Sequence, residues 1–152
     1  MAATILYATR GGEASYSNQD FVIALARERN ADLLLLYVTD VQFFDRFARP
    51  VVVDVEAEME GLAKFLLLMA KERAEKAGVS AATIVRRGNF RTALEETARE
   101  RQVSLIVLGS PAEGTGITSR EYLESLIEEI WANTGTETLL VHAGSITAHY
   151  HR

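Results

Sequence analysis

The fold is decided by the stretch Leu105-Ile106-Val107-Leu108-Gly109-Ser110, an apolar run that ends in a glycine turn. A second run of the same kind, Thr4-Ile5-Leu6-Tyr7-Ala8-Thr9, is also followed by a glycine turn, at Gly11-Gly12. Continuous apolar runs are typical of strands that are buried on both faces, as in a parallel sheet covered by helices. If the two strands are neighbours, their turns meet at the carboxyl edge of the sheet, where open α/β sheets bind ligands.

Strand-like and helix-like runs alternate along the whole chain of 152 residues. The expected strands are Thr4–Thr9, Leu33–Thr39, Ala82–Arg86, Ser104–Leu108 and Thr138–His142. The expected helices are Asn18–Arg29, Asp54–Ala77, Phe90–Arg101 and Ser119–Asn133. This alternation predicts a single doubly wound α/β domain, and the pattern is compatible with the strand orders 2-1-3-4-5 and 3-2-1-4-5.

Two helices carry further local signals. In the second helix, Met59, Leu62, Leu66, Met69 and Arg73 follow helical spacing, which predicts one stripe of an amphipathic helix, and Gly78 is placed to end it. Asn89 directly precedes the third helix and is expected to cap it, because its side chain can accept a hydrogen bond from an otherwise unsatisfied amide.

A long connection follows the second strand and contains Phe43, Phe44 and Phe47. Connections of this length are often functional. The aromatic side chains of the Phe43–Phe47 segment either fold back over the sheet or form a ligand lid or partner surface, and the sequence leaves both interpretations open.

Composition excludes several classes of protein. The net charge of −5 argues against a nucleic-acid partner, which would need a basic face. No apolar run reaches the roughly 18 residues of a membrane span, and no secretory signal is visible, so no membrane association is expected. The chain has no cysteine, which suits a reducing compartment, and we expect a cytoplasmic protein.

Four segments in this order and spacing carry a family resemblance: Ile5–Ser15, Leu34–Val38, Arg87–Phe90 and Val103–Ser110. Over nearly its whole length the chain resembles the universal stress protein family. The resemblance implies a flavodoxin-like, five-stranded parallel sheet of order 3-2-1-4-5 with helices on both faces. We expect this domain to cover residues 1–143 and to be followed by a C-terminal tail, residues 144–152.

The resemblance also implies how the chain assembles and acts. Family members form homodimers, commonly through the last strand, which is Thr138–His142 here. They are regulatory rather than strongly catalytic, with slow ATP hydrolysis in some members, and they divide into ATP-binding and non-ATP-binding kinds.

The resemblance implies a nucleotide crevice at the ends of the first, second and fourth strands. Its candidate residues are Ala8, Thr9, Arg10, Val38, Leu108, Gly109, Gly114 and Ser125. In ATP-binding members the phosphate loop reads Gly, two residues, Gly, nine residues, and then Gly-Ser or Gly-Thr. Glycines at these places let backbone amides approach the phosphates.

Three positions depart from this pattern. Ala112 stands where the second glycine is expected, and Gly114 restores it two residues later. Counting nine residues from Gly114 leads to Glu124-Ser125, so a carboxylate replaces a glycine where phosphates are expected. Arg10 stands in place of the family's aspartate, and a guanidinium cannot accept hydrogen bonds from ribose hydroxyls. Arg10 and Glu124 either pair across the crevice and close it, or are independent substitutions.

Two functions therefore remain open. The first is a regulatory or stress-response protein whose crevice holds ATP or another adenine nucleotide. The alternative is a dimeric protein-interaction module that binds no nucleotide and has an unknown protein partner. No catalytic constellation of nucleophile, histidine and acid can be assigned, so we do not expect an enzyme. His149 and His151 lie in the expected tail, and no metal site is predicted there.

Overall fold

The computed structural model describes residues 3–9, 16–39, 52–110 and 120–151. Its helices are α1 (Tyr16–Arg29), α3 (Val52–Lys76), α4 (Phe90–Glu100) and α5 (Arg120–Thr134). Its strands are β1 (Thr4–Ala8), β2 (Asp32–Thr39), β3 (Ala81–Arg87), β4 (Leu105–Ser110), β5 (Glu137–His142) and β6 (Ser145–Tyr150). Every strand and helix expected from the sequence is present, with small shifts at the ends.

The strands form one sheet in the order β3-β2-β1-β4-β5-β6. The first five pair in parallel, which confirms the expected order 3-2-1-4-5. The expectation of five strands was wrong by one, because β6 adds an antiparallel strand beside β5.

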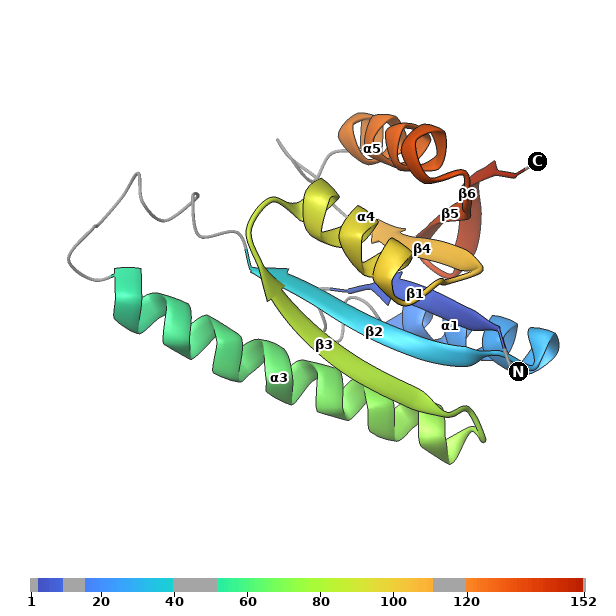
Figure 1. Ribbon diagram of the computed structural model, residues 1–152. Coiled ribbons are helices and arrows are strands. Elements are labelled where there is room, and N and C mark those ends of the chain that lie inside the picture. Colours follow the sequence, from blue (N-terminus) through green and yellow to red (C-terminus); the bar gives the residue numbers. More distant parts are fainter. Residues whose placement is uncertain (1–2, 10–15, 40–51, 111–119, 152) are drawn as a thin grey trace.

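Helices cover both faces of the sheet, with α1 and α3 on one side and α4 and α5 on the other (Figure 1). Alternate residues of a strand point to opposite faces. Ile5 and Tyr7 of β1 therefore belong to the cluster beneath α1 and α3, whereas Leu6 and Ala8 belong to the cluster beneath α4 and α5. The continuous apolar runs of the strands are explained by burial on both faces.

The expected C-terminal tail is not a tail in the structure. Residues 145–150 form β6, which pairs with β5 through a register that shifts between Leu140 and Val141. Ala148 and Tyr150 pack against the core, and the ring centroid of Tyr150 lies 5.6 Å from that of Trp131. The residues from Ser145 to Tyr150 alternate between polar and apolar, which is the period-two pattern of a half-buried strand.

The position of β6 bears on the expected dimer contact. β5 is hydrogen-bonded to β4 on one edge and to β6 on the other. Thr138–His142 can therefore pair with a strand of a second copy only if β6 is displaced, and this contact stays a prediction.

The inner face of α3 differs from the expected one. Its buried residues are Ala63, Leu67, Ala70 and Ala74. Leu62 and Met69, which belong to the stripe predicted from the helical spacing, are exposed. The cap of α4 is as predicted, because the side chain of Asn89 accepts a hydrogen bond of 3.0 Å from the amide of Thr92.

Candidate functional site

The ends of β1 and β4 lie side by side, as the crevice hypothesis requires. Ala8 of β1 is in register with Leu108 of β4 on one side and with Leu36 of β2 on the other. After β1 the chain passes to α1 on one face of the sheet, and after β4 it passes to α5 on the other. This reversal between β1 and β4 is the topological switch point at which open α/β sheets hold ligands.

The candidate residues on these strands lie at the carboxyl end of the sheet, where the crevice is expected. Ala8 and Leu108 are buried in the cluster beneath α4 and α5, and Val38 at the end of β2 is half-buried against the same cluster. Thr9 is 7% exposed, and its amide donates a hydrogen bond of 3.0 Å to the carbonyl of Leu36. The backbone at this point is therefore held in place by the neighbouring strand.

The other candidate positions are divided between α5 and segments outside the described residues. Ser125 is exposed and Glu124 is half-buried, both within α5. Arg10, Ala112 and Gly114 lie outside the described residues, and with them the hypothesis of an ion pair between Arg10 and Glu124. The structure therefore describes the part of the candidate site that lies at the ends of the strands and along α5.

Gly109 is held between two side chains that the sequence did not single out. A Cβ atom added to Gly109 would lie 3.0 Å from the hydroxyl oxygen of Tyr7 and 3.1 Å from the side-chain nitrogen of Asn18. Both distances are tighter than ordinary van der Waals contact, and Tyr7 and Asn18 are 1% and 3% exposed. A Cβ atom at position 109 would therefore require a small shift of one of these two buried side chains.

The hydroxyl of Tyr7 is a buried polar group below this turn. It has no hydrogen bond of ordinary geometry within the described part of the chain. Burial raises the pKa of Tyr7 to about 12, and the nearby Thr9 side chain opposes this shift. Tyr7 is thus a neutral phenol at physiological pH, and its position inside an apolar strand hid it from motif-based reasoning.

Asn18 connects the site to the end of the chain. Its side-chain oxygen accepts a hydrogen bond of 3.0 Å from the amide of Gly144, in the turn between β5 and β6. Gly144 adopts a φ of +81°, which favours glycine, and it lies close to the backbone of Ser17. The first turn of α1 and the β5–β6 turn therefore support each other beside Gly109.

A hollow of about 350 Å³ lies at the end of β3, lined by Arg86, Arg87, Gly88, Asn89, Thr92, Ala93 and Glu96. Its two arginines could attract an anion. However, Arg86 pairs with Glu96 and Glu100, and Arg87 pairs with Glu60. The hydrogen bond from Arg87 holds the pKa of Glu60 below its ordinary value. These carboxylates compensate the positive charge, so the hollow lacks the character of an anion site.

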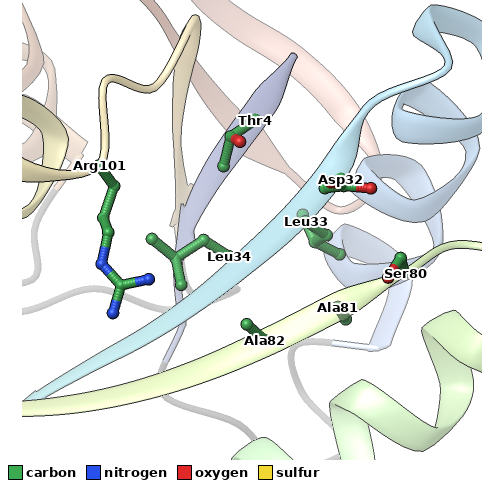
Figure 2. Close-up of a pocket in the computed structure, with 8 residues that line it drawn as sticks. All are labelled: Thr4, Asp32, Leu33, Leu34, Ser80, Ala81, Ala82 and Arg101. Atoms are coloured by element: carbon green, nitrogen blue, oxygen red, sulfur yellow. The ribbon is translucent and has the colours of Figure 1, made fainter. Parts of the chain in front are cut away.

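A second hollow, of about 250 Å³, lies at the opposite edge of the sheet. Figure 2 shows Arg101 on one side of it and Asp32 on the other, with Leu34 of β2 between them. It is formed by the amino ends of β1, β2 and β3, away from the crevice. Open α/β sheets bind ligands at the carboxyl ends of their strands, so this hollow is not a candidate for the same ligand.

The described residues hold no group of three or more histidine, aspartate or glutamate side chains placed to bind a metal ion. His149 lies 2.7 Å from Glu137, and its ring centroid is 4.5 Å from that of His151. Among the described helices, none combines the length and the apolar character needed to cross a membrane.

Known proteins resemble this chain in sequence and in fold. A model of the universal stress protein family matches residues 1–142. The universal stress protein YxiE of Bacillus subtilis (strain 168) is 33% identical over 116 residues, covering 70% of this chain and 77% of that protein.

Solved structures share the fold at lower identity. The universal stress protein UspA from Lactobacillus plantarum is 19% identical with a TM-score of 0.73, covering 91% of this chain and 97% of that one. A universal stress protein in complex with cAMP is 23% identical with a TM-score of 0.63, covering 93% and 97%. Because the family model spans nearly the whole domain and a relative exceeds 30% identity, the chain belongs to the universal stress protein family.

Proposed function

We propose that this protein is a regulatory, stress-response member of its family that binds an adenine nucleotide at the crevice between β1 and β4. The observation that carries the proposal is the adjacency of Ala8 and Leu108 at the switch point, directly before Thr9 and Gly109. A universal stress protein of the same fold has been solved with cAMP, which supports this class of ligand. Cytoplasmic localisation stays a prediction.

The proposed ligand lies across the strand ends. Thr9 and Val38, at the ends of β1 and β2, would line the nucleoside end of the crevice. Leu108, Gly109 and Ser125 would lie toward its phosphate end, together with Gly114. The amide of Thr9 already donates to Leu36, so Thr9 would meet a ligand through its other atoms.

The charge at the phosphate end favours a nucleotide with fewer phosphates than ATP. Glu124 replaces a glycine of the family pattern and is half-buried on α5. A carboxylate near a triphosphate is repelled by like charge, and the repulsion grows with the number of phosphate charges. We therefore expect AMP or cAMP to bind more tightly than ATP.

Calorimetric titration with AMP, cAMP, ADP and ATP at one fixed ionic strength tests this proposal. Glu124→Gln removes the charge and keeps the shape, so it should raise the affinity for ATP more than the affinity for AMP. Glu128→Gln, one turn further along α5 and exposed, is the matched control for a change in net charge. Absence of heat with all four nucleotides at millimolar concentration would overturn the proposal.

The second candidate is an interaction module that acts without a nucleotide. It is favoured by the large apolar side chains that α3 leaves exposed, among them Phe65 and Leu68. Such residues are typical of binding surfaces when they gather on one face. A chain that gives no heat with nucleotides and yet associates through α3 would establish this function instead. Neither candidate requires catalysis, and release of phosphate from ATP by the purified protein would measure any slow hydrolysis.

A further inference from the structure

The outer face of α3 carries four large apolar side chains that the fold leaves exposed. Leu62 is 55% exposed, Phe65 57%, Leu68 57% and Met69 40%. They follow one another at spacings of three and four residues, so they lie on one face of the helix. Figure 1 shows α3 running beside β2 and β3 on the outside of the sheet. We call the set Leu62, Phe65, Leu68 and Met69 the outer α3 patch.

The core of the domain is built from the other face of α3. Leu67, Ala70 and Ala74 belong to the buried cluster that α3 shares with β1 and β2, and within the described residues the outer α3 patch does not. An amphipathic surface helix usually turns polar residues away from the core. Apolar side chains that gather on such an outward face mark interaction sites in soluble proteins.

A glycine lies on the same outward face. Gly61 is exposed, four residues before Phe65 and seven before Leu68. Within the described residues, a Cβ atom added to Gly61 would meet no heavy atom within 4 Å, so the fold leaves room for alanine. Glycine in a helix interior is less favourable than alanine. Gly61 therefore destabilises the free chain, and its presence is explained if a second backbone approaches α3 closely at this point.

Carboxylates border the outer α3 patch along the helix axis. Glu58 lies seven residues before Phe65 and Glu72 seven residues after it, about 10 Å away in each direction, so the three form one column on the helix surface. Both glutamates are exposed. Glu75 is exposed as well and lies seven residues after Leu68. The apolar patch is therefore acidic at both ends.

Lysines do little to compensate this negative charge. Lys76 lies 3.6 Å from Glu72 of the same helix. Glu58 forms no ion pair with any other described residue. The other two lysines of α3, Lys64 and Lys71, lie on its flank, about 100 to 120° around the helix axis from the centre of the patch. The column that contains the patch thus keeps an excess of negative charge.

We propose that the outer α3 patch binds an amphipathic helix of another protein, one whose apolar stripe is bordered by lysines or arginines. The apolar stripe covers Phe65 and its neighbours, and the partner backbone approaches α3 at Gly61. Basic residues seven positions before and after the central apolar residue of the partner lie against Glu58 and Glu72. Recognition of an amphipathic helix through anchors spaced in this way is a recurring mode of peptide binding.

The same charges disfavour the other occupants of an exposed apolar face. Two copies of the patch packed about Phe65 would place Glu58 of one copy against Glu72 of the other, which brings like charges together. An anionic membrane surface repels these carboxylates, and the chain carries a net charge of −5. A basic helix covers the apolar residues and compensates the carboxylates at once.

Fluorescence anisotropy of a labelled synthetic peptide, titrated with the full chain, tests the proposal. The peptide is an amphipathic helix of about 20 residues, with a leucine stripe and a lysine seven residues before and after its central leucine. The matched control peptide carries glutamates in place of these two lysines. We expect the lysine peptide to bind in the micromolar range and the glutamate peptide to bind at least about tenfold more weakly.

Two variants test the apolar centre of the patch. Phe65→Glu places a charge there and should weaken binding of the lysine peptide at least about tenfold. Ile146→Glu is the matched control, because Ile146 is 49% exposed on β6, and it should leave the affinity unchanged. Thermal unfolding checks that both variants stay folded.

A charge reversal tests the acidic border. Glu58→Lys should weaken binding of the lysine peptide about threefold and strengthen binding of the glutamate peptide by a similar factor. Glu128→Lys, at an exposed position of α5, makes the same change in net charge and should alter neither affinity. Equal effects of the two variants would show that net charge, and not the position of Glu58, controls binding, and this would contradict the proposal.

Gly61→Ala separates recognition from folding. Alanine favours the helix and meets no neighbour, so this variant should raise the Tm by about 2 to 4 °C. It should also weaken binding of the lysine peptide about threefold, because the added methyl group holds the partner helix further from α3. Binding that is unchanged in Gly61→Ala would contradict the close approach at this position.

Three results would overturn the proposal as a whole. They are no binding of either peptide at millimolar concentration of the chain, equal binding of both peptides, and binding of the lysine peptide that survives Phe65→Glu. Vesicles of phosphatidylcholine and phosphatidylserine are a second probe, and sedimentation of the unaltered chain with them, lost in Phe65→Glu, would assign the patch to a membrane surface instead. The heat of AMP titration should be the same for Phe65→Glu and the unaltered chain, so this proposal and the nucleotide crevice can fail separately.

Discussion

Asn18 accepts a hydrogen bond of 3.0 Å from the amide of Gly144, a residue 126 positions away in the chain. Asn18 is 3% exposed, and its side-chain nitrogen lies beside Gly109 at the end of β4. One side chain thus connects the start of α1, the β5–β6 turn and the end of β4. The same hydrogen bond links α1 to the turn that leads into β6.

Replacement of Asn18 should therefore destabilise the protein. Asn18→Ala leaves the Gly144 amide without its acceptor, and such a loss costs about 1 to 3 kcal/mol. Urea unfolding followed by circular dichroism measures the change. Ser17→Ala, at the exposed neighbouring position, is the control and should change the free energy of unfolding by less than about 0.5 kcal/mol. Equal effects of the two variants would show that the Asn18–Gly144 contact contributes nothing.

The close approach of Gly109 and Tyr7 leads to a prediction about stability that a pair of variants tests. Gly109→Ala should cost about 1 to 3 kcal/mol, because its Cβ would press on the hydroxyl of a buried tyrosine. Tyr7→Phe removes a hydroxyl that lacks a well-formed hydrogen bond, so alone it should cost less than about 0.5 kcal/mol. In the Tyr7→Phe background, Gly109→Ala should cost less than in the unaltered chain. A double-mutant cycle gives this coupling, and strict additivity would contradict it.

The carboxylate of Glu137 predicts a pH dependence of stability. Hydrogen bonds from Arg29, and then from His149, hold the pKa of Glu137 below its ordinary value of 4.5. Because the folded pKa is lowered, the stabilisation is complete above the unfolded pKa and is lost as the pH falls through the folded pKa. The difference in unfolding free energy between the unaltered chain and Glu137→Gln should therefore shrink from pH 6 toward pH 3 (about three pH units).

Urea titrations across this range measure the difference at each pH. Glu75→Gln, on exposed α3, controls for the loss of one negative charge and should show a smaller change with pH. A gap between Glu137→Gln and the unaltered chain that is constant with pH would show that the ionised pair with Arg29 is not the cause.

The N-cap of α4 should contribute measurably to the free energy of unfolding. Asn89→Ala removes the acceptor for the Thr92 amide and should cost about 1 kcal/mol. Asn89→Asp keeps the acceptor oxygen and places a negative charge at the helix start, so it should retain most of the stability. Differential scanning calorimetry of both variants tests this. If the aspartate variant is as unstable as the alanine variant, another contact of Asn89 is responsible.

The amount that could be predicted from the sequence differs between strands and helices. The strands β1, β2 and β4 were predictable because a run that is apolar at every position must be buried on both faces. The face of α3 that meets the sheet was not predictable in this way. Leu62 and Leu67 both lie on apolar stripes, and periodicity does not say which stripe meets the sheet. The structure buries three alanines of α3 together with Leu67 and leaves Leu62 exposed.

The candidate site likewise combines residues that were predictable from the sequence with residues that were not. Gly109 and Thr9 were found by their position after apolar strands, whereas Tyr7 and Asn18 carry no motif. Their importance comes from contacts with Gly109 and Gly144, which are remote in the sequence. Such contacts form only when the chain folds, so no local sequence pattern predicts them.

By itself, the sequence determined the α/β alternation and the two apolar strands that are each followed by a glycine turn. It also placed Arg10 and Glu124 where the family pattern has an aspartate and a glycine. These features depend on residue type and local spacing. Only the tertiary structure decided that β6 covers β5, that α3 turns its bulky residues outward, and that Tyr7 and Asn18 enclose Gly109. Each of these features depends on which distant segments pack together. That packing is determined by the burial of residues over the whole chain rather than by any one stretch of it.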